Sequence, residues 1–303
     1  MNTRYSFYQL HAKIDEMSKI LDLKKYVEGD KNTLDMIRSY YKINHWAYRH
    51  FHSQDGFMHF RISMNGCFTD EDVYQQPDSV SEFIKDGDFV LELGCGQGAN
   101  ILYLAHCHPA ATFVGFDLHP RKKIDIPQNV TIYEQDYSTL SQIADHSVDV
   151  VYAIETLVHC SDKEKVLKEV YRVMKPGAVM IDYDYALTAP YHSFDDHVQM
   201  AIALVSKGGA AAMIESLEEQ NIHYANSGLE IEKTVDFTEN VLPDLKHLER
   251  KAAKILKHPL LTKVMFGVLP AQFVTNIILG YLGYDTGKAG VITYQKRVIC
   301  KRR

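Results

Sequence analysis

Three glycines lie within five residues directly after an apolar run, in the stretch FVLELGCGQGAN at residues 89–100. Gly94, Gly96 and Ala99 fit the pattern G-x-G-x-x-G/A, in which glycine permits a tight turn and a close approach of the backbone to a ligand. A strand, such a loop and a helix together form a seat for a cofactor that contains a nucleoside. The pattern alone accommodates either a dinucleotide or S-adenosylmethionine (SAM).

Acidic residues around this loop favour SAM. Glu92 lies two residues before Gly94, where a carboxylate is unfavourable for a pyrophosphate but compatible with the ammonium and sulfonium groups of SAM. Asp117 ends the second expected strand and can accept hydrogen bonds from ribose hydroxyls, which both cofactors need. Asp136 ends the third and can accept from an adenine amino group. The chain also leaves no room for a separate dehydrogenase substrate domain.

Two titratable residues, Glu155 and His159, follow the fourth expected strand. Ligands of open α/β sheets bind outside the carboxyl ends of the strands, so both side chains belong to the ligand edge. Methyl transfer to a carbon–carbon double bond leaves a carbocation, which aromatic faces stabilise and a base must deprotonate. Either residue could be that base. In the simpler interpretation, Glu155 orients SAM or a neighbour and His159 has no chemical role.

Strands alternating with helices from residue 88 onward predict a parallel sheet covered on both faces. Apolar runs predict strands at 88–94, 112–118, 129–136, 148–156, 178–185, 229–237 and 290–301. Helices are expected at 98–106, at 161–177 with Ser161 as N-cap, and from 195 to about 220. The predicted fold class is therefore α/β: a Rossmann-like, seven-stranded, mostly parallel sheet with helices on both faces.

Two further helical regions predict a cover for the sheet. Residues 5–27 and 31–52 carry apolar and aromatic side chains at helical spacing, and residues 240–286 are helical and apolar. We therefore expect an N-terminal helical lid at 1–77 and a main domain at 78–303. A helical cap insertion at about 240–287 precedes the last strand.

The uncharged stretch 264–284 has the length of a membrane span. Pro270, Gln272, Thr275 and Asn276 interrupt it, and flanking strands that pair in one sheet would require the chain to return on the same side. The insertion is better interpreted as an apolar cap over a pocket. Whether it also contacts a membrane or a second copy of the chain is left open.

Composition narrows the choice of partner and compartment. A net charge of −6 without a long basic run gives little support for nucleic-acid binding. The N-terminus lacks the apolar core of a signal peptide, and five dispersed cysteines favour reduced thiols in the cytoplasm. The spacing of His45, His50, His52 and His59 fits no common zinc pattern, so we expect no metal site.

The runs ELGCGQG, GFDL, EQD, VDVVYAIETLVHCSD and VLKEVYRVMKPGAVMID, in this order, resemble class I SAM-dependent methyltransferases over residues 88–185 and more weakly to 301. The lead-in YYKINHWAYRHFHSQDGFMHF resembles that of the sterol C-methyltransferase and cyclopropane-fatty-acid-synthase branch, in which a Tyr-Tyr pair closes over SAM. IETLVH is similar to the sterol enzymes' IEATCH and departs from it at Thr156, Leu157 and Val158.

The resemblance implies roles for individual positions. The cofactor-binding residues that it implies are Tyr40, Glu92, Gly94, Gly96, Gly98, Asp117, Leu118, Gln135, Asp136 and Ala153. The glycines and Ala153 would lie by the methionine part, Asp117 by the ribose, and Gln135 and Asp136 by the adenine. Tyr40 or Tyr41 would close the pocket, and Tyr41 joins Glu155 and His159 as a candidate catalytic residue.

The expected activity is methyl transfer from SAM, with S-adenosylhomocysteine (SAH) as product. The expected acceptor is small and lipophilic, such as a sterol, an isoprenoid or another lipid-like molecule, with carbon favoured as the methylated atom. The serious alternative is O- or N-methylation of a small polar metabolite or natural product. An NAD-dependent oxidoreductase and a scaffold that binds no SAM are the competing classes, and the sequence does not name the acceptor.

Overall fold

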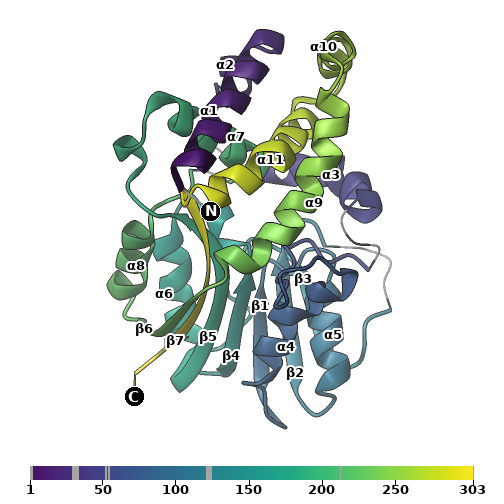
Figure 1. Ribbon diagram of the computed structural model, residues 1–303. Helices are drawn as coiled ribbons and strands as arrows, with labels where there is room; N and C mark the ends of the chain where they lie inside the picture. The colour runs from purple at the N-terminus through teal and green to yellow at the C-terminus, as the bar shows by residue number, and fades with distance from the viewer. Residues whose placement is uncertain are drawn as a thin grey trace.

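A seven-stranded sheet forms the centre of the chain, with strand order β3-β2-β1-β4-β5-β7-β6 (Figure 1). The computed structural model describes residues 3–28, 34–51, 53, 55–120, 125–211 and 213–302. The strands are β1 (Phe89–Leu93), β2 (Thr112–Asp117), β3 (Val130–Glu134), β4 (Val148–Ile154), β5 (Met174–Leu187), β6 (Glu230–Asp236) and β7 (Ile292–Cys300). Only β7 runs antiparallel to its neighbours β5 and β6. The predicted fold class is confirmed.

Helices cover both faces of the sheet. α4 (Gln75–Ser81) and α5 (Ala99–Cys107) pack on one face, and α6 (Lys163–Val173) and α8 (Leu217–Asn226) pack on the other. The strands between them are apolar on both sides, as in the buried pattern of β1, because each face has a helical partner. This burial fixes the carboxyl ends of β1, β2, β3 and β4 at one edge.

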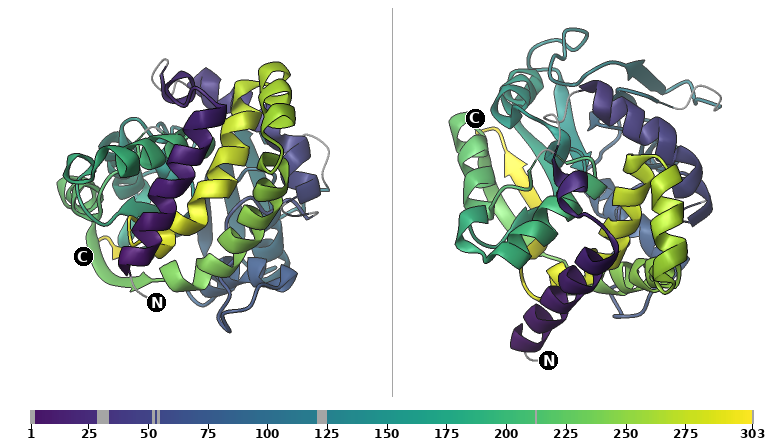
Figure 2. Two further views of the ribbon diagram at one scale, coloured as in Figure 1. Left: turned by 45° about the horizontal axis from the view of Figure 1, so that its top comes forward. Right: turned by 90° about the horizontal axis from the view of Figure 1, so that it is seen from above.

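A layer of helices lies beyond that edge (Figures 1 and 2). It consists of α1 (Thr3–Ile20), α2 (Lys24–Val27), α3 (Leu34–Phe51), α7 (Asp196–Gly208), α9 (Thr238–Leu256), α10 (Pro259–Val268) and α11 (Ala271–Lys288). α11 packs on α3, α7, α9 and α1. As expected, α9 to α11 are inserted between the paired strands β6 and β7. None of the helices in the described part of the chain is long and apolar enough to cross a membrane.

Three local expectations were wrong. Asp162, rather than Ser161, caps α6, because its side chain accepts from the backbone N–H of Lys165. α6 ends at Val173 instead of 177, and β5 begins at Met174, before Pro176 and Gly177. The long helix expected from 195 to about 220 is two helices, because Ser216 and Glu219 form a capping box that starts α8.

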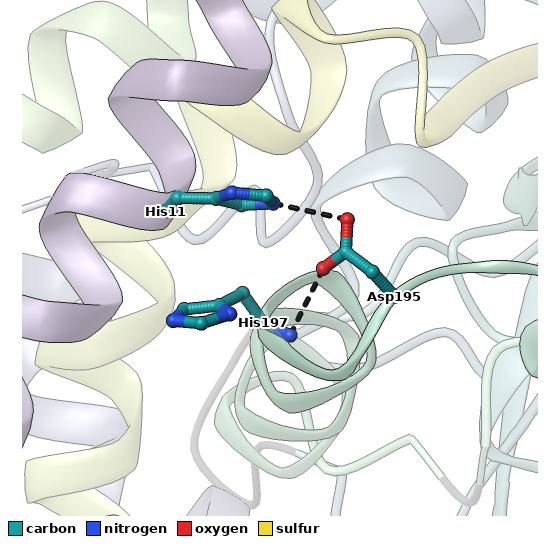
Figure 3. Close-up of side chains that lie close together, drawn as sticks. All are labelled: His11, Asp195 and His197. Atoms are coloured by element: carbon teal, nitrogen blue, oxygen red, sulfur yellow. Dashed lines mark hydrogen bonds and ion pairs between the residues drawn. The ribbon is translucent and has the colours of Figure 1, made fainter.

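Polar contacts fix α1 on the rest of the helical layer. His11 Nε2 lies 3.1 Å from Asp195 Oδ2, at the N-terminus of α7, and the backbone N–H of His197 donates to the same carboxylate (Figure 3). The buried Lys13 ammonium contacts Glu249 of α9 at 2.6 Å and also Asp285 of α11. A buried cation with two anionic partners sets the register of α1 against α9 and α11.

Candidate functional site

A cavity of about 1080 Å³ lies between the carboxyl edge of the sheet and the helical layer. Its floor is formed by the loops after β1, β2, β3 and β4, and its roof by α3, α9 and α11. Convergent polar groups on one side and apolar helices on the other are typical of a small-molecule site. The volume exceeds the usual range for one drug-sized ligand, so the cavity has room for two molecules.

The glycine loop after β1 forms one wall, and its conformation excludes side chains. Gly94 has φ +67, and a Cβ built on it would lie 2.0 Å from Thr156 Oγ1. Thr156 belongs to the loop after β4, so glycine at this position lets two ligand-edge loops meet. Gly94 and Gly96 both line the cavity, whereas Gly98 starts α5 with φ +82 and lies outside the lining.

Two carboxylates line the same end of the cavity. Asp117 Oδ2 accepts from the N–H of Gly96 at 2.8 Å, and its Oδ1 accepts from the N–H of His119 at 2.7 Å. Burial raises the pKa of the Asp117 carboxyl. Asp136 accepts from the backbone and hydroxyl of Ser138 at 2.8 and 2.7 Å. An ionised carboxylate has about four acceptor positions, so both can accept further bonds from a ligand. Leu118 also lines this end.

Glu155 lies where the floor meets the apolar roof. Its Oε1 accepts from the N–H of Phe60 at 2.7 Å and from the hydroxyl of Tyr294 at 2.8 Å. Burial raises the pKa of its carboxyl to about 8. Its φ of +51 is a left-handed conformation that costs a non-glycine residue about 1–3 kcal/mol and is found most often at functional sites.

His159 and Tyr41 form a hydrogen-bonded pair in the cavity wall. His159 Nδ1 lies 3.1 Å from the carbonyl oxygen of Ala210, which can only accept, so Nδ1 carries the proton. Burial lowers the pKa of the His159 imidazole to about 4, so the ring is neutral near pH 7. Its Nε2 therefore accepts from the Tyr41 hydroxyl, 2.7 Å away. The pair joins the loop after β4 to α3.

Comparisons with known proteins identify the kind of domain that carries this cavity. Residues 91–181 match the family described as methyltransferase domain. A sterol 24-C-methyltransferase of Aspergillus fumigatus is 28% identical over 158 residues, covering 49% of this chain and 41% of that protein. A 27-O-demethylrifamycin SV methyltransferase of Amycolatopsis mediterranei is 27% identical, covering 53% of this chain and 60% of that protein. The matches thus span about half of these relatives.

The fold extends further than the sequence match. The 4+2 cyclase SpnF superposes with a TM-score of 0.70 at 16% identity, covering 89% of this chain and 96% of that chain. The cyclopropane synthase MmaA2 of Mycobacterium tuberculosis gives 0.65 at 13% identity, with the same coverage. The chain carries a class I methyltransferase domain. SAM is the cofactor that this class implies.

Besides Gly98, four further predicted cofactor contacts lie outside the cavity lining. Glu92 is only 1% exposed beneath the glycine loop, and burial raises the pKa of its carboxyl to about 8. Ala153 is fully buried within β4. The Gln135 side chain donates to the carbonyl of Thr139 at 2.8 Å. Tyr40 also lies outside the lining, and its hydroxyl donates to the carbonyl of Gly208 at 2.7 Å.

The two adjacent tyrosines of α3 therefore differ in place. The amide of Asn276 in α11 donates to the Tyr40 hydroxyl at 2.6 Å, so Tyr40 joins α3 to α7 and α11 inside the helical layer. Tyr41 lines the cavity. Tyr41 therefore faces the cavity, whereas Tyr40 packs inside the helical layer.

Three participants were not anticipated from the sequence. Tyr294 of β7 donates to Glu155 from 139 positions away, and no local signal marks it. Thr156 fills the space above Gly94. The carbonyl of Ala210 sets the tautomer of His159. Residue 210 was expected to lie inside one long helix, so nothing indicated that its carbonyl reaches His159.

The histidines of the lead-in are only partly described. The side chains of His45, His50 and His52 lie outside the described residues. His59 Nε2 lies 3.1 Å from Asn100 Oδ1 at the cavity wall. Among the described side chains, the group spaced to hold a metal ion is His11, Asp195 and His197, which does not line the cavity (Figure 3).

Proposed function

We propose that this chain transfers a methyl group from SAM to a carbon atom of a small lipophilic acceptor. The observation that carries the proposal is one continuous cavity with a polar floor on the methyltransferase loops and a mostly apolar roof, in which Arg38, Lys251 and Lys254 are charged. Its volume of about 1080 Å³ leaves space for an acceptor beside the cofactor.

The residues of the floor fit SAM. Bound SAM supplies an activated methyl group on a sulfonium. Gly94 and Gly96 leave the backbone free to approach the methionine part, because neither presents a side chain. Asp117 is available to ribose hydroxyls and Asp136 to the adenine amino group, through the acceptor positions that their loop contacts leave free.

The roof favours an apolar acceptor. Leu245, Leu248 and Ala252 of α9, with Phe273 and Ile277 of α11, line the cavity opposite the glycine loop. These side chains exclude water, which protects a carbocation from capture and strengthens electrostatic interactions inside the site. We propose that α1 to α3 act as a lid and α9 to α11 as a cap over this acceptor.

Glu155 is the proposed base. In its ionised form the carboxylate stabilises positive charge on the acceptor and takes the proton that restores the double bond. Tyr294 and the Phe60 N–H hold Oε1, which orients the carboxylate. Tyr41 presents its hydroxyl to the cavity, with its proton directed at His159 Nε2, so the phenolic oxygen faces developing positive charge.

O-methylation of a natural product is the second candidate. The neutral His159 Nε2 could take the proton of an acceptor hydroxyl through Tyr41, and one relative is named for an O-methylation substrate. SpnF, named as a cyclase, carries the same fold, so the fold alone does not decide the chemistry.

The first test is calorimetry with SAM and SAH on the full chain. Wild type should bind both, and Asp117→Asn should weaken binding about 10- to 100-fold, because a charged acceptor for hydroxyls is lost. Asp125→Asn, an exposed aspartate outside the cavity, is the matched control. No binding by wild type, or equal loss in both variants, would contradict the cofactor assignment.

The second test follows the methyl group. SAM with a labelled methyl is offered with a sterol that has a side-chain double bond, and separately with a phenolic acceptor of similar size. The proposal expects label on carbon, located by NMR of the product. Label on oxygen alone would contradict C-methylation and favour O-methylation.

A further inference from the structure

The outer face of α10 carries an exposed aliphatic stripe. Leu260 is 84% exposed, Leu261 61%, Val264 67% and Val268 79%. At 3.6 residues per turn these four positions fall within about 100° of one another, so their side chains form one continuous surface. Figure 1 shows α10 at the far end of the helical layer from the sheet.

The opposite face of α10 is packed. Thr262 is fully buried and Phe266 is 4% exposed. The Thr262 hydroxyl donates to the carbonyl of Ile255 at 2.9 Å, which fixes α10 on the end of α9. The helix is therefore held in one orientation and is apolar on both faces. Water does not favour such an outer face, so the stripe marks an interaction surface.

The charges around the stripe indicate what it contacts. From Lys251 to Tyr284 the chain contains four lysines and no aspartate or glutamate, although the whole chain has a net charge of −6. Lys254, Lys257 and Lys263 are exposed. An aliphatic stripe beside lysines, without a carboxylate, matches the headgroup boundary of an anionic bilayer.

We propose that α10 docks this protein on the surface of a membrane that contains anionic lipids. α10 has ten residues and is about 15 Å long, half the thickness of a hydrocarbon core, so it lies in the interface. The aliphatic stripe enters the acyl boundary, and Lys257 and Lys263 contact phosphate groups.

Docking there would deliver a lipophilic acceptor, and this step rests on the proposed function. α10 joins the ends of α9 and α11, and both of these helices line the cavity. Lys254 and Ile255, in the last turn of α9, belong to the cavity lining. An acceptor leaving the bilayer beside α10 therefore reaches the cavity between α9 and α11 without crossing water.

The test is sedimentation of the full chain with vesicles of phosphatidylcholine, alone or with 30% phosphatidylglycerol (about the anionic fraction needed for a strong surface potential). Wild type should bind the anionic vesicles. Leu260→Gln with Val264→Gln should weaken that binding about tenfold or more, because two aliphatic insertions are lost. Lys257→Glu with Lys263→Glu should reduce binding to the anionic vesicles at least as much. Added salt should weaken the binding of the wild-type protein to these vesicles.

Matched controls distinguish a specific effect of α10 from the effect of changing any exposed apolar or basic side chain. Met213→Gln with Ile222→Gln removes two other exposed apolar side chains, and Lys85→Glu with Lys233→Glu makes the same change in charge elsewhere. Both should bind like wild type. Wild type that stays in solution with every vesicle, or equal binding by the α10 variants, would overturn the proposal.

One rival occupant is a second copy of this chain. A lipid-free dimer that Leu260→Gln with Val264→Gln converts to monomers would overturn membrane docking in favour of a dimer interface. SAM calorimetry on the same variants should match wild type, because none of the changed residues lines the cavity. Failure of docking is thereby distinguished from failure of the proposed methyl transfer.

Discussion

The floor and the roof of the cavity are built in different ways. The floor comes from loops that each follow a strand, and backbone hydrogen bonds shape it, such as that from Gly96 to Asp117. The roof comes from α3, α9 and α11, and side chains more than 200 positions apart fix it, such as Tyr40 and Asn276. The proposed cofactor site on the floor is thus shaped by residues that lie close to strand ends. The roof is a tertiary assembly that can change with the acceptor.

Glu155 lies at the junction of the two walls, and its removal should have the largest effect. Glu155→Gln keeps an acceptor for Phe60 and Tyr294 but cannot take a proton. We expect turnover on a lipophilic acceptor to fall by about 10² to 10⁴ while SAM binding is kept, because general-base catalysis contributes that much. Steady-state kinetics beside SAM calorimetry measure both quantities.

The matched control is Glu92→Gln. Both carboxyls are buried and have a pKa raised to about 8, but Glu92 lies beneath the floor, outside the cavity lining. Turnover should change much less in Glu92→Gln. Equal losses in the two variants would mean that Glu155 supports the fold rather than the reaction.

The pH profile distinguishes the two candidate bases. Burial raises the pKa of Glu155 to about 8 and lowers that of His159 to about 4. If Glu155 is the base, kcat/KM should rise about fiftyfold from pH 6 to pH 8, as the ionised fraction of a group with this pKa grows from about 1% to about half. With His159 as base the profile would be flat over this range, because its imidazole is already neutral.

Removing the hydroxyl of Tyr41 or of Tyr40 compares a group that faces the cavity with one that packs inside the helical layer. Tyr41→Phe removes a hydroxyl from the cavity, so turnover should fall about tenfold with little change in melting temperature. Tyr40→Phe leaves the carbonyl of Gly208 and the amide of Asn276 without this partner, which costs about 1–3 kcal/mol, or several degrees in melting temperature.

Thermal unfolding and turnover are measured on both variants under one set of conditions. The reverse pattern, with turnover lost in Tyr40→Phe and stability lost in Tyr41→Phe, would reverse the roles given to the two residues.

The same contrast explains what could be predicted from the sequence. The seven strands follow from apolar runs in the sequence, and Gly94, Asp117 and Asp136 lie close to strand ends that set their positions. Gln135 was predicted beside the adenine with Asp136, but both follow the end of β3, and the Gln135 side chain bonds to Thr139 and Gln142 instead. Local patterns therefore located the loops of the floor, although Glu92, Gly98, Gln135 and Ala153 lie outside the cavity lining.

The roof required contacts that a sequence does not display. The apolar character of residues 240–286 predicted a cover, but nothing local indicated that Tyr294 of β7 would hold Glu155. Tyr40 and Tyr41 have the same side chain, and only the packing of α3 determines which one faces the cavity. The break between α7 and α8 depends on a capping box at Ser216 that competes with a continuous helical pattern.

The smallest expected effect is the pH dependence of stability. Burial raises the pKa of Glu92, Glu155 and Asp184 to about 8. The folded chain therefore holds more protons on these groups than the unfolded chain between about pH 4.5 and pH 8, so stability falls as the pH rises through this window. His159 acts in the opposite direction only between about pH 4 and pH 6.5, because its folded pKa is lowered.

Between pH 6.5 and pH 8.5 these carboxyls lower the stability as the pH rises, and the melting temperature should fall by several degrees. Glu92→Gln is neutral at every pH, so it should make the fall smaller while leaving the cavity unchanged. Glu155→Gln should flatten the curve by a similar amount but lower turnover by about 10² to 10⁴. The pair of variants therefore separates a carboxyl that only affects stability from one that also takes part in the reaction. A melting temperature that rises over this range would mean that these carboxyls are ionised in the folded chain. The predicted rise of kcat/KM between pH 6 and pH 8 would then fail too, because it requires a raised pKa for Glu155.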